Sequence, residues 1–238
     1  MIKIINCFIL LCFWLCIFSV IVEANSSKPL YKVSFDDYKT GDEREWLAGK
    51  GFEFKEDAKY RTRVLFTGDN DRLNVEVERR AFGIMLNESV DISDFSYVEI
   101  DWGVNIYPKG SSYEQGVRNE AIMLIVFLGD ERMPSGAFFI PNSPYFIGLY
   151  LCHGDDRMNF PYTGRYYKKS GRYVCVDRPE PGNMVTSRFN LMQAYREYFD
   201  KEEDDNPAVS GFAIAGDTKR ASNGGNASAF IREIRFYK

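Results

Sequence analysis

Two neighbouring apolar segments constrain the fold of this chain more than any other feature. In residues 97–107, apolar side chains alternate with polar or small ones, as in Val98, Ile100 and Trp102 against Glu99 and Asp101. This period of two predicts a β-strand with one face in a core and the other in water. Residues 121–128, AIMLIVFL, are apolar throughout and rich in β-branched side chains, which predicts a strand buried on both faces. Together the two segments predict the centre of a β-sandwich.

Shorter strand patterns recur along the rest of the chain. A hairpin is predicted where Gly68-Asp69-Asn70-Asp71 separates residues 61–67 from 72–78. One helix is predicted over residues 188–202, with Asn190 as its cap, because Leu191, Ala194, Tyr195 and Tyr198 recur at helical spacing. Further strands are predicted at residues 30–35, 82–86, 144–152, 173–176, 210–215 and 227–236. About ten strands with one short helix predict a mainly antiparallel, jelly-roll-like β-sandwich.

The first residues have the pattern of an export signal. Lys3 precedes residues 7–22, which are apolar apart from Ser19, and Val22 and Ala24 are small enough for a signal peptidase site. We therefore predict a signal peptide over residues 1–24, cleavage after Ala24, and a single secreted or periplasmic domain over residues 25–238. The alternative is an uncleaved membrane anchor, since residues 4–22 approach the length of a bilayer span.

Cysteine usage and charge narrow the range of functions. Of the five cysteines, only Cys152 and Cys175 lie beyond the predicted leader, and an even pair in an oxidising compartment predicts one disulfide. Two buried thiols are the alternative; a catalytic cysteine is disfavoured because the single histidine is the only one available to activate it. The net charge of −4 argues against a nucleic-acid partner.

Several short motifs follow one another in an ordered series. They are Phe35-Asp36-Asp37 with Trp46, residues 73–78, 98–102 and 124–127, Arg188-Phe189-Asn190 with Tyr195-Arg196 and Phe199, residues 211–214, Gly216-Asp217-Thr218, and residues 229–236. In this order they resemble a family of secreted proteobacterial proteins, domain-of-unknown-function family 3047. That family has Asp-x-Asp near Asp217, where this chain has Lys219 at the second position. The resemblance implies an extracytoplasmic sandwich similar to carbohydrate-binding modules, and no established activity comes with it.

Two groups of acidic residues are candidates for a catalytic or a metal-binding role. Glu99-Ile100-Asp101 matches the start of the Glu-x-Asp-x-x-Glu strand of some sandwich glycosidases, but Val104 stands where the second glutamate belongs. A retaining pair needs two carboxyl groups about 5–5.5 Å apart, so we expect Glu99 and Asp101 to be solvated and no catalytic residue to lie here. An extracellular polysaccharide hydrolase or lyase, with its acid and base on separate strands, is the alternative.

A metal site is the second possibility for acidic groups. His153 alone cannot build a zinc site, whereas Asp155, Asp156 and Asp217 offer the oxygen ligands that calcium prefers. A solvated polar loop is the simpler interpretation, and we predict no cofactor.

Tyrosines in two long loops form the most suggestive segment for binding. Loop 154–171 contains Tyr162, Arg165, Tyr166 and Tyr167, followed by Lys168 and Lys169, and loop 108–119 contains Tyr113. Aromatic rings can stack on sugars, and the cations can pair with uronate or phosphate groups. Packing of the rings beneath their own loop is the alternative. We therefore predict a non-catalytic glycan-binding protein, with a cell-envelope protein that binds another protein as a further alternative.

Overall fold

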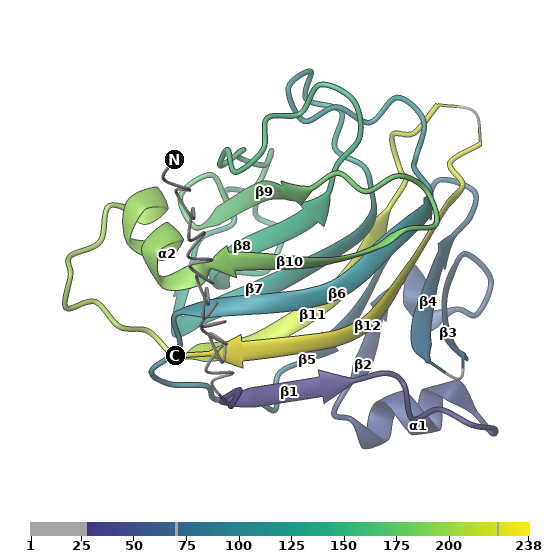
Figure 1. Ribbon diagram of the computed structural model, residues 1–238. Helices are drawn as coiled ribbons and strands as arrows, with labels where there is room; N and C mark the ends of the chain where they lie inside the picture. Colours follow the sequence, from purple (N-terminus) through teal and green to yellow (C-terminus); the bar gives the residue numbers. More distant parts are fainter. Residues whose placement is uncertain (1–27, 70, 223) are drawn as a thin grey trace, which may run out of the picture.

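The chain folds as a sandwich of two β-sheets (Figure 1), in a computed structural model that describes residues 28–238 except 70 and 223. The strands are β1 (Tyr31–Ser34), β2 (Glu53–Glu56), β3 (Val64–Asp69), β4 (Arg72–Val77), β5 (Phe82–Asn87), β6 (Tyr97–Ile106), β7 (Glu120–Met133), β8 (Ser143–Leu151), β9 (Gly171–Asp177), β10 (Met184–Asn190), β11 (Val209–Asp217) and β12 (Ala227–Tyr237). Sheet A has the order β10-β6-β12-β4-β3, with β1 also paired to β12. Sheet B has the order β2-β5-β11-β7-β8-β9. The predicted β-sandwich is therefore confirmed.

The two segments that predicted the sandwich lie in opposite sheets. Strand β6 sits inside sheet A and β7 inside sheet B, so they face each other across the core and do not pair. Val98, Ile100 and Trp102 are fully buried, as their alternation predicted, and the indole nitrogen of Trp102 donates to Ser187 Oγ at 2.8 Å. Strand β7 is buried on both faces over most of its apolar run: Leu124 belongs to the main core, while Met123 belongs to a second cluster on the other side.

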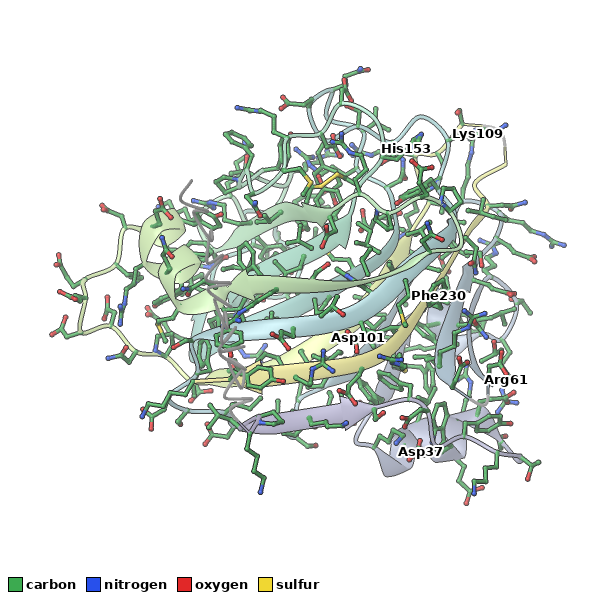
Figure 2. The ribbon with its side chains drawn as sticks, viewed as in Figure 1. Asp37, Arg61, Asp101, Lys109, His153 and Phe230 are labelled. Carbon is green, nitrogen blue, oxygen red and sulfur yellow. A yellow bond between two sulfur atoms is a disulfide. The ribbon has the colours of Figure 1, made fainter. Side chains whose placement is uncertain are left out.

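One strand pair departs from the antiparallel pattern. Strands β8 and β9 run parallel, so the chain between them must cross from one end of the sheet to the other. The predicted disulfide closes this crossover, with the Cα atoms of Cys152 and Cys175 5.5 Å apart. It is visible beside β9 in Figure 2, and such a bond fits an extracellular or periplasmic protein.

The helical elements differ from those that the sequence pattern indicates. Helix α2 covers Leu191–Phe199, while residues 188–190 of the predicted helix belong to β10. Asn190 caps α2 as expected, since its Oδ1 accepts from the backbone N–H of Gln193 at 2.9 Å. Helix α1 (Glu43–Gly49) was not predicted; it is capped by Asp42 and buries only Leu47, which is too little to give a helical period. A 3₁₀ turn, Asp57–Lys59, completes the helical elements of the described residues.

The export signal falls outside the described residues, so the cleavage after Ala24 stays a prediction. Between residues 28 and 238, where the chain is described, no helix is both long and apolar enough to cross a membrane.

Candidate functional site

The two long loops meet over the outer face of sheet B. Register pairs Ala215 with Met123, Met123 with Tyr150, and Tyr150 with Cys175, so these residues share the face that points away from the main core. Tyrosines from the loops cover them and form a separate buried group, the tyrosine cluster. Its members are Tyr113, Met123, Tyr150, Cys152, Tyr162, Cys175 and Ala215.

Within this cluster the ring faces of two predicted binding residues are already occupied. Tyr113 stacks on Tyr150 with ring centroids 4.3 Å apart, and it lies 5.6 Å from Tyr162. Tyr113 is 4% exposed and Tyr162 is 6% exposed. Both tyrosines therefore pack beneath their own loops, which was the alternative prediction for these rings.

A buried carboxylate fastens the loops together. Asp156 accepts hydrogen bonds from the backbone N–H of Tyr113 at 2.6 Å and of Glu114 at 3.3 Å, and from the hydroxyl of Tyr150 at 3.0 Å. Asp155 is exposed, yet its oxygens accept from the side chains of Ser112 and of a nearby glutamine in loop 108–119. These two aspartates therefore order the loops.

The metal candidates do not come together. Among the residues that the structure describes, no three His, Cys, Asp or Glu side chains are grouped so that they could hold a metal ion. Asp217 lies at the end of β11 as the register partner of Glu120, and the ring of His153 stacks on Tyr107 at 4.9 Å. Asp155, Asp156 and Asp217 thus give the calcium hypothesis no shared site.

Glu120 and Asp217 form a pair of carboxyl groups on neighbouring strands. Glu120 is 4% exposed, and the hydroxyl of Tyr113 donates to its Oε2 at 2.8 Å. Burial raises the pKa of Glu120 well above its usual range, and the nearby charge of Asp217 adds to this effect. Burial also raises the pKa of Asp217. The sequence analysis missed Glu120, although an acidic residue immediately before an apolar strand is a signal for such a group.

The carboxylates of β6 lie on the outer face of sheet A, where Figure 2 labels Asp101. The expectation that they are solvated is wrong for Asp101, whose side chain is 3% exposed. It accepts from Arg232 at 3.0 Å, from Arg235 at 3.1 Å and from Thr186 at 2.6 Å. Burial alone would raise the pKa of Asp101, but these hydrogen bonds outweigh it and hold the pKa below its usual range. A carboxylate held this firmly by arginines is not available as an acid or base.

The remaining predicted residues lie on a different surface. Tyr167 joins loop 163–170 to loop 134–142: its N–H donates to the carbonyl of Ser135 at 2.8 Å and its hydroxyl to the carbonyl of Pro141 at 2.7 Å. The ring of Tyr166 meets that of Phe139 edge to face, with centroids 6.4 Å apart, and the Arg165 guanidinium lies 5.3 Å from the Tyr166 ring centre.

This second surface is the aromatic–basic patch, made by Phe138, Phe139, Arg165, Tyr166, Tyr167, Lys168 and Lys169. Phe138 is fully exposed and Phe139 is 78% exposed. Tyr166 and Tyr167 are partly exposed, and the three cations are exposed. The structure therefore divides the five predicted binding residues, with Tyr113 and Tyr162 in the tyrosine cluster and the other three in the patch. The sequence analysis missed the two phenylalanines, although Phe138-Phe139-Ile140 is an apolar run inside a polar loop.

The likeness of this chain to known proteins is confined to solved structures. No family model matches the chain, and no curated protein matches it, so the resemblance in sequence stays a prediction. Among solved structures, the chain is similar to endoglucanase 3 of Trichoderma harzianum from family GH12, with TM-score 0.38, 7% identity and coverage of 73% of this chain and 81% of the other.

Two further solved structures show a similar degree of likeness. The xyloglucanase domain of NopAA from Sinorhizobium fredii, in complex with cellobiose, has TM-score 0.40, 9% identity and coverage of 88% of this chain and 100% of that chain. The exoplasmic/lumenal domain of VIP36, in its Ca²⁺/Man3GlcNAc-bound form, has TM-score 0.37, 13% identity and coverage of 80% and 84%. Likeness at this level leaves the function to be argued from the residues of this chain.

Proposed function

We propose that this protein is a non-catalytic glycan-binding protein of the extracellular or periplasmic space. The aromatic–basic patch carries the proposal, because it holds exposed ring faces and unshielded cations side by side on ordered loops. Large apolar rings that stay in water cost free energy, so an exposed group of them marks a contact surface. Rings of this kind stack on the C–H faces of sugars, and neighbouring cations bind polar or charged substituents.

The acidic groups of the protein support binding without catalysis. Asp101 is held by two arginines, and Glu120 lies beneath Tyr113, where a substrate cannot reach it in this conformation. Two hollows in the surface of the described residues, of about 60 Å³ and about 500 Å³, are lined by other residues than Glu120 and Asp217. A general acid must come within hydrogen-bond reach of the bond that it cleaves.

The test is a binding screen of residues 25–238 against soluble polysaccharides, followed by titration calorimetry on the ligands found. Replacing Tyr166 or Phe139 by alanine should weaken binding by about tenfold or more, the loss of roughly 1.4 kcal/mol of contact energy. Tyr60, which is 66% exposed and lies outside the patch, supplies the matched control Tyr60→Ala. No binding to any polysaccharide, or equal affinity in all variants, would refute the proposal.

The paired carboxyl groups favour a second candidate, a polysaccharide hydrolase. Glu120 and Asp217 stand opposite each other on neighbouring strands, and a carboxyl group with a raised pKa can serve as a general acid. This function requires loop 108–119 to lift Tyr113 away from Glu120. Release of reducing ends from a polysaccharide, lost in both Glu120→Gln and Asp217→Asn while binding is kept, would establish it; no release by the native protein would exclude it for the substrates tested.

A further inference from the structure

The two loops that build the aromatic–basic patch have an unusual balance of charge. Loops 134–142 and 163–170 together contain Arg165, Lys168 and Lys169, and they contain no aspartate or glutamate. The whole chain has a net charge of −4, so the charge of the patch is opposite in sign to that of the protein as a whole. Such a reversal raises the local concentration of anions at that surface.

Two arginines at the adjoining strand ends, Arg132 in β7 and Arg172 in β9, are used in internal contacts, whereas the three loop cations are not. Arg172 donates to the backbone carbonyls of Lys168 and Tyr198, and Arg132 lies 3.8 Å from the carboxylate of Glu88. No ion pair within the described part of the chain involves Arg165, Lys168 or Lys169. All three are exposed. Their charges are therefore available to a ligand.

The rings and the cations are held in one surface. Tyr167 is fixed at both its N–H and its hydroxyl to loop 134–142, and Lys168 and Lys169 follow it directly. The ring of Tyr166 contacts the ring of Phe139 edge to face, and the guanidinium of Arg165 lies 5.3 Å from the Tyr166 ring centre. A ligand that lies across Tyr166 thus meets positive charge next to the ring it contacts.

We propose that the patch binds anionic polysaccharides, whose sugar rings contact Phe139 and Tyr166 while their carboxylate or sulfate groups pair with Arg165, Lys168 and Lys169. This inference rests on the proposed glycan-binding function and adds the chemical class of the ligand. Carboxylate and sulfate share the chemistry that a guanidinium or ammonium group recognises, a negative charge spread over oxygen acceptors. The alternation of rings with cations suits a chain of sugars, in which apolar faces and anionic groups also alternate.

The experiment compares each charged polymer with its own uncharged parent. Dextran sulfate is paired with dextran, and polygalacturonate with its fully methyl-esterified form. Binding to residues 25–238 is measured by titration calorimetry at several salt concentrations. We expect one or both charged polymers to bind at least about tenfold more tightly than the parent, and this preference to shrink as salt screens the charges.

Two triple variants separate the patch from general charge effects. Arg165→Gln with Lys168→Gln and Lys169→Gln should abolish the preference for the charged polymer. Lys39→Gln with Lys59→Gln and Lys109→Gln removes the same charge at exposed sites elsewhere and should keep it. Thermal unfolding of both variants shows that the fold is retained, since exposed positions contribute little to stability.

The remaining outcomes distinguish this inference from the function on which it rests. Equal affinity for charged and uncharged polymers would overturn the anionic preference and leave glycan binding in place. An equal loss in both triple variants would also overturn it. Binding to no polysaccharide would overturn both proposals. If the protein then bound vesicles of phosphatidylcholine with phosphatidylglycerol, the patch would be a lipid-binding surface.

Discussion

The hydroxyl of Tyr113 donates a hydrogen bond to Oε2 of Glu120 at 2.8 Å, which ties loop 108–119 to the first residue of β7. Both groups are buried, and burial raises the pKa of each of them well above its usual range. Ionising either group would place a charge in the tyrosine cluster, where water cannot solvate it. The fold therefore favours the uncharged forms of both side chains.

Replacing Glu120 with glutamine should stabilise the protein at neutral pH. An unfolded glutamate ionises near about pH 4.3, whereas folded Glu120 holds its proton to higher pH. The folded state then binds more protons than the unfolded state, so this group destabilises the protein progressively as the pH rises above about 4.3. Glutamine has the shape of the protonated group and its carbonyl can accept from Tyr113. The melting temperature of Glu120→Gln should exceed that of the native protein at pH 7.

The same comparison at low pH supplies the control. Near about pH 4 the native glutamate is protonated in the folded state and mostly protonated in the unfolded state, so the two proteins should melt close to the same temperature. Glu131→Gln, at an exposed site on the same strand, should match the native protein at both pH values. The raised pKa would be contradicted if Glu120→Gln melted at a lower temperature than the native protein at pH 7 although the two melted together near pH 4.

Asp101 should behave in the opposite way. Its carboxylate joins Arg232 and Arg235, and its pKa is held low, so its contribution to stability is present above about pH 3.9 and is lost as the pH falls through the folded pKa. Removing one partner of a buried ion pair costs about 3–5 kcal/mol, and the partial exposure of Arg232 reduces this to about 2–3 kcal/mol. Asp101→Asn should lower the melting temperature at pH 7 by about 5–10 °C, and by less at acid pH. Glu76→Gln on the same sheet should have almost no effect.

The disulfide should contribute measurably to stability because it closes the crossover between β8 and β9 and thereby restricts the unfolded chain. Cys152 and Cys175 are 23 residues apart, and closing a loop of that length restricts the unfolded chain by about 3 kcal/mol. Replacing both cysteines by alanine should lower the melting temperature by about 6–12 °C. Reducing agent should lower that of the native protein similarly and leave the double variant unchanged. A native protein insensitive to reductant after full reduction would contradict this role.

Strand β6 could be predicted because its own side chains set a period. Val98, Ile100 and Trp102 are buried at every second position, and only an extended chain with one face in the core does this. Residues 188–190 of β10 fall in the predicted helix because the helical spacing that begins at Leu191 was extended back over them. Along β10 only Ser187 and Phe189 are buried. Its strand conformation comes from pairing with β6 at positions such as Arg188 opposite Glu99. Such pairing over long sequence separations leaves little pattern within a short segment.

The sequence predicted several residues of the candidate site but not which of them are accessible. The tyrosines of loop 154–171 stand out in sequence, but the fold of the loops decides which rings remain accessible. Tyr162 turns inward because its hydroxyl accepts from the N–H of Arg157 at 2.7 Å and donates to Glu114 at 2.8 Å. Phe139, an apolar residue that a sequence pattern would place in a core, turns outward. The sequence of an irregular loop has no repeating pattern, so neither the inward orientation of Tyr162 nor the outward orientation of Phe139 could be predicted.

The hydrogen bond between Tyr167 and Pro141 should control the affinity of the aromatic–basic patch without touching the ligand. Replacing Tyr167 with phenylalanine keeps the ring against Phe146 and removes only the link to the carbonyl of Pro141, which is 2.7 Å away. A hydrogen bond of this kind contributes about 1 kcal/mol, so polysaccharide affinity should fall by about fivefold as the two loops separate. Amide hydrogen exchange should become faster in residues 134–142 and stay unchanged in β6. Tyr60→Phe, outside the patch, is the control. Unchanged exchange together with a large loss of affinity would show instead that the Tyr167 hydroxyl binds the ligand directly.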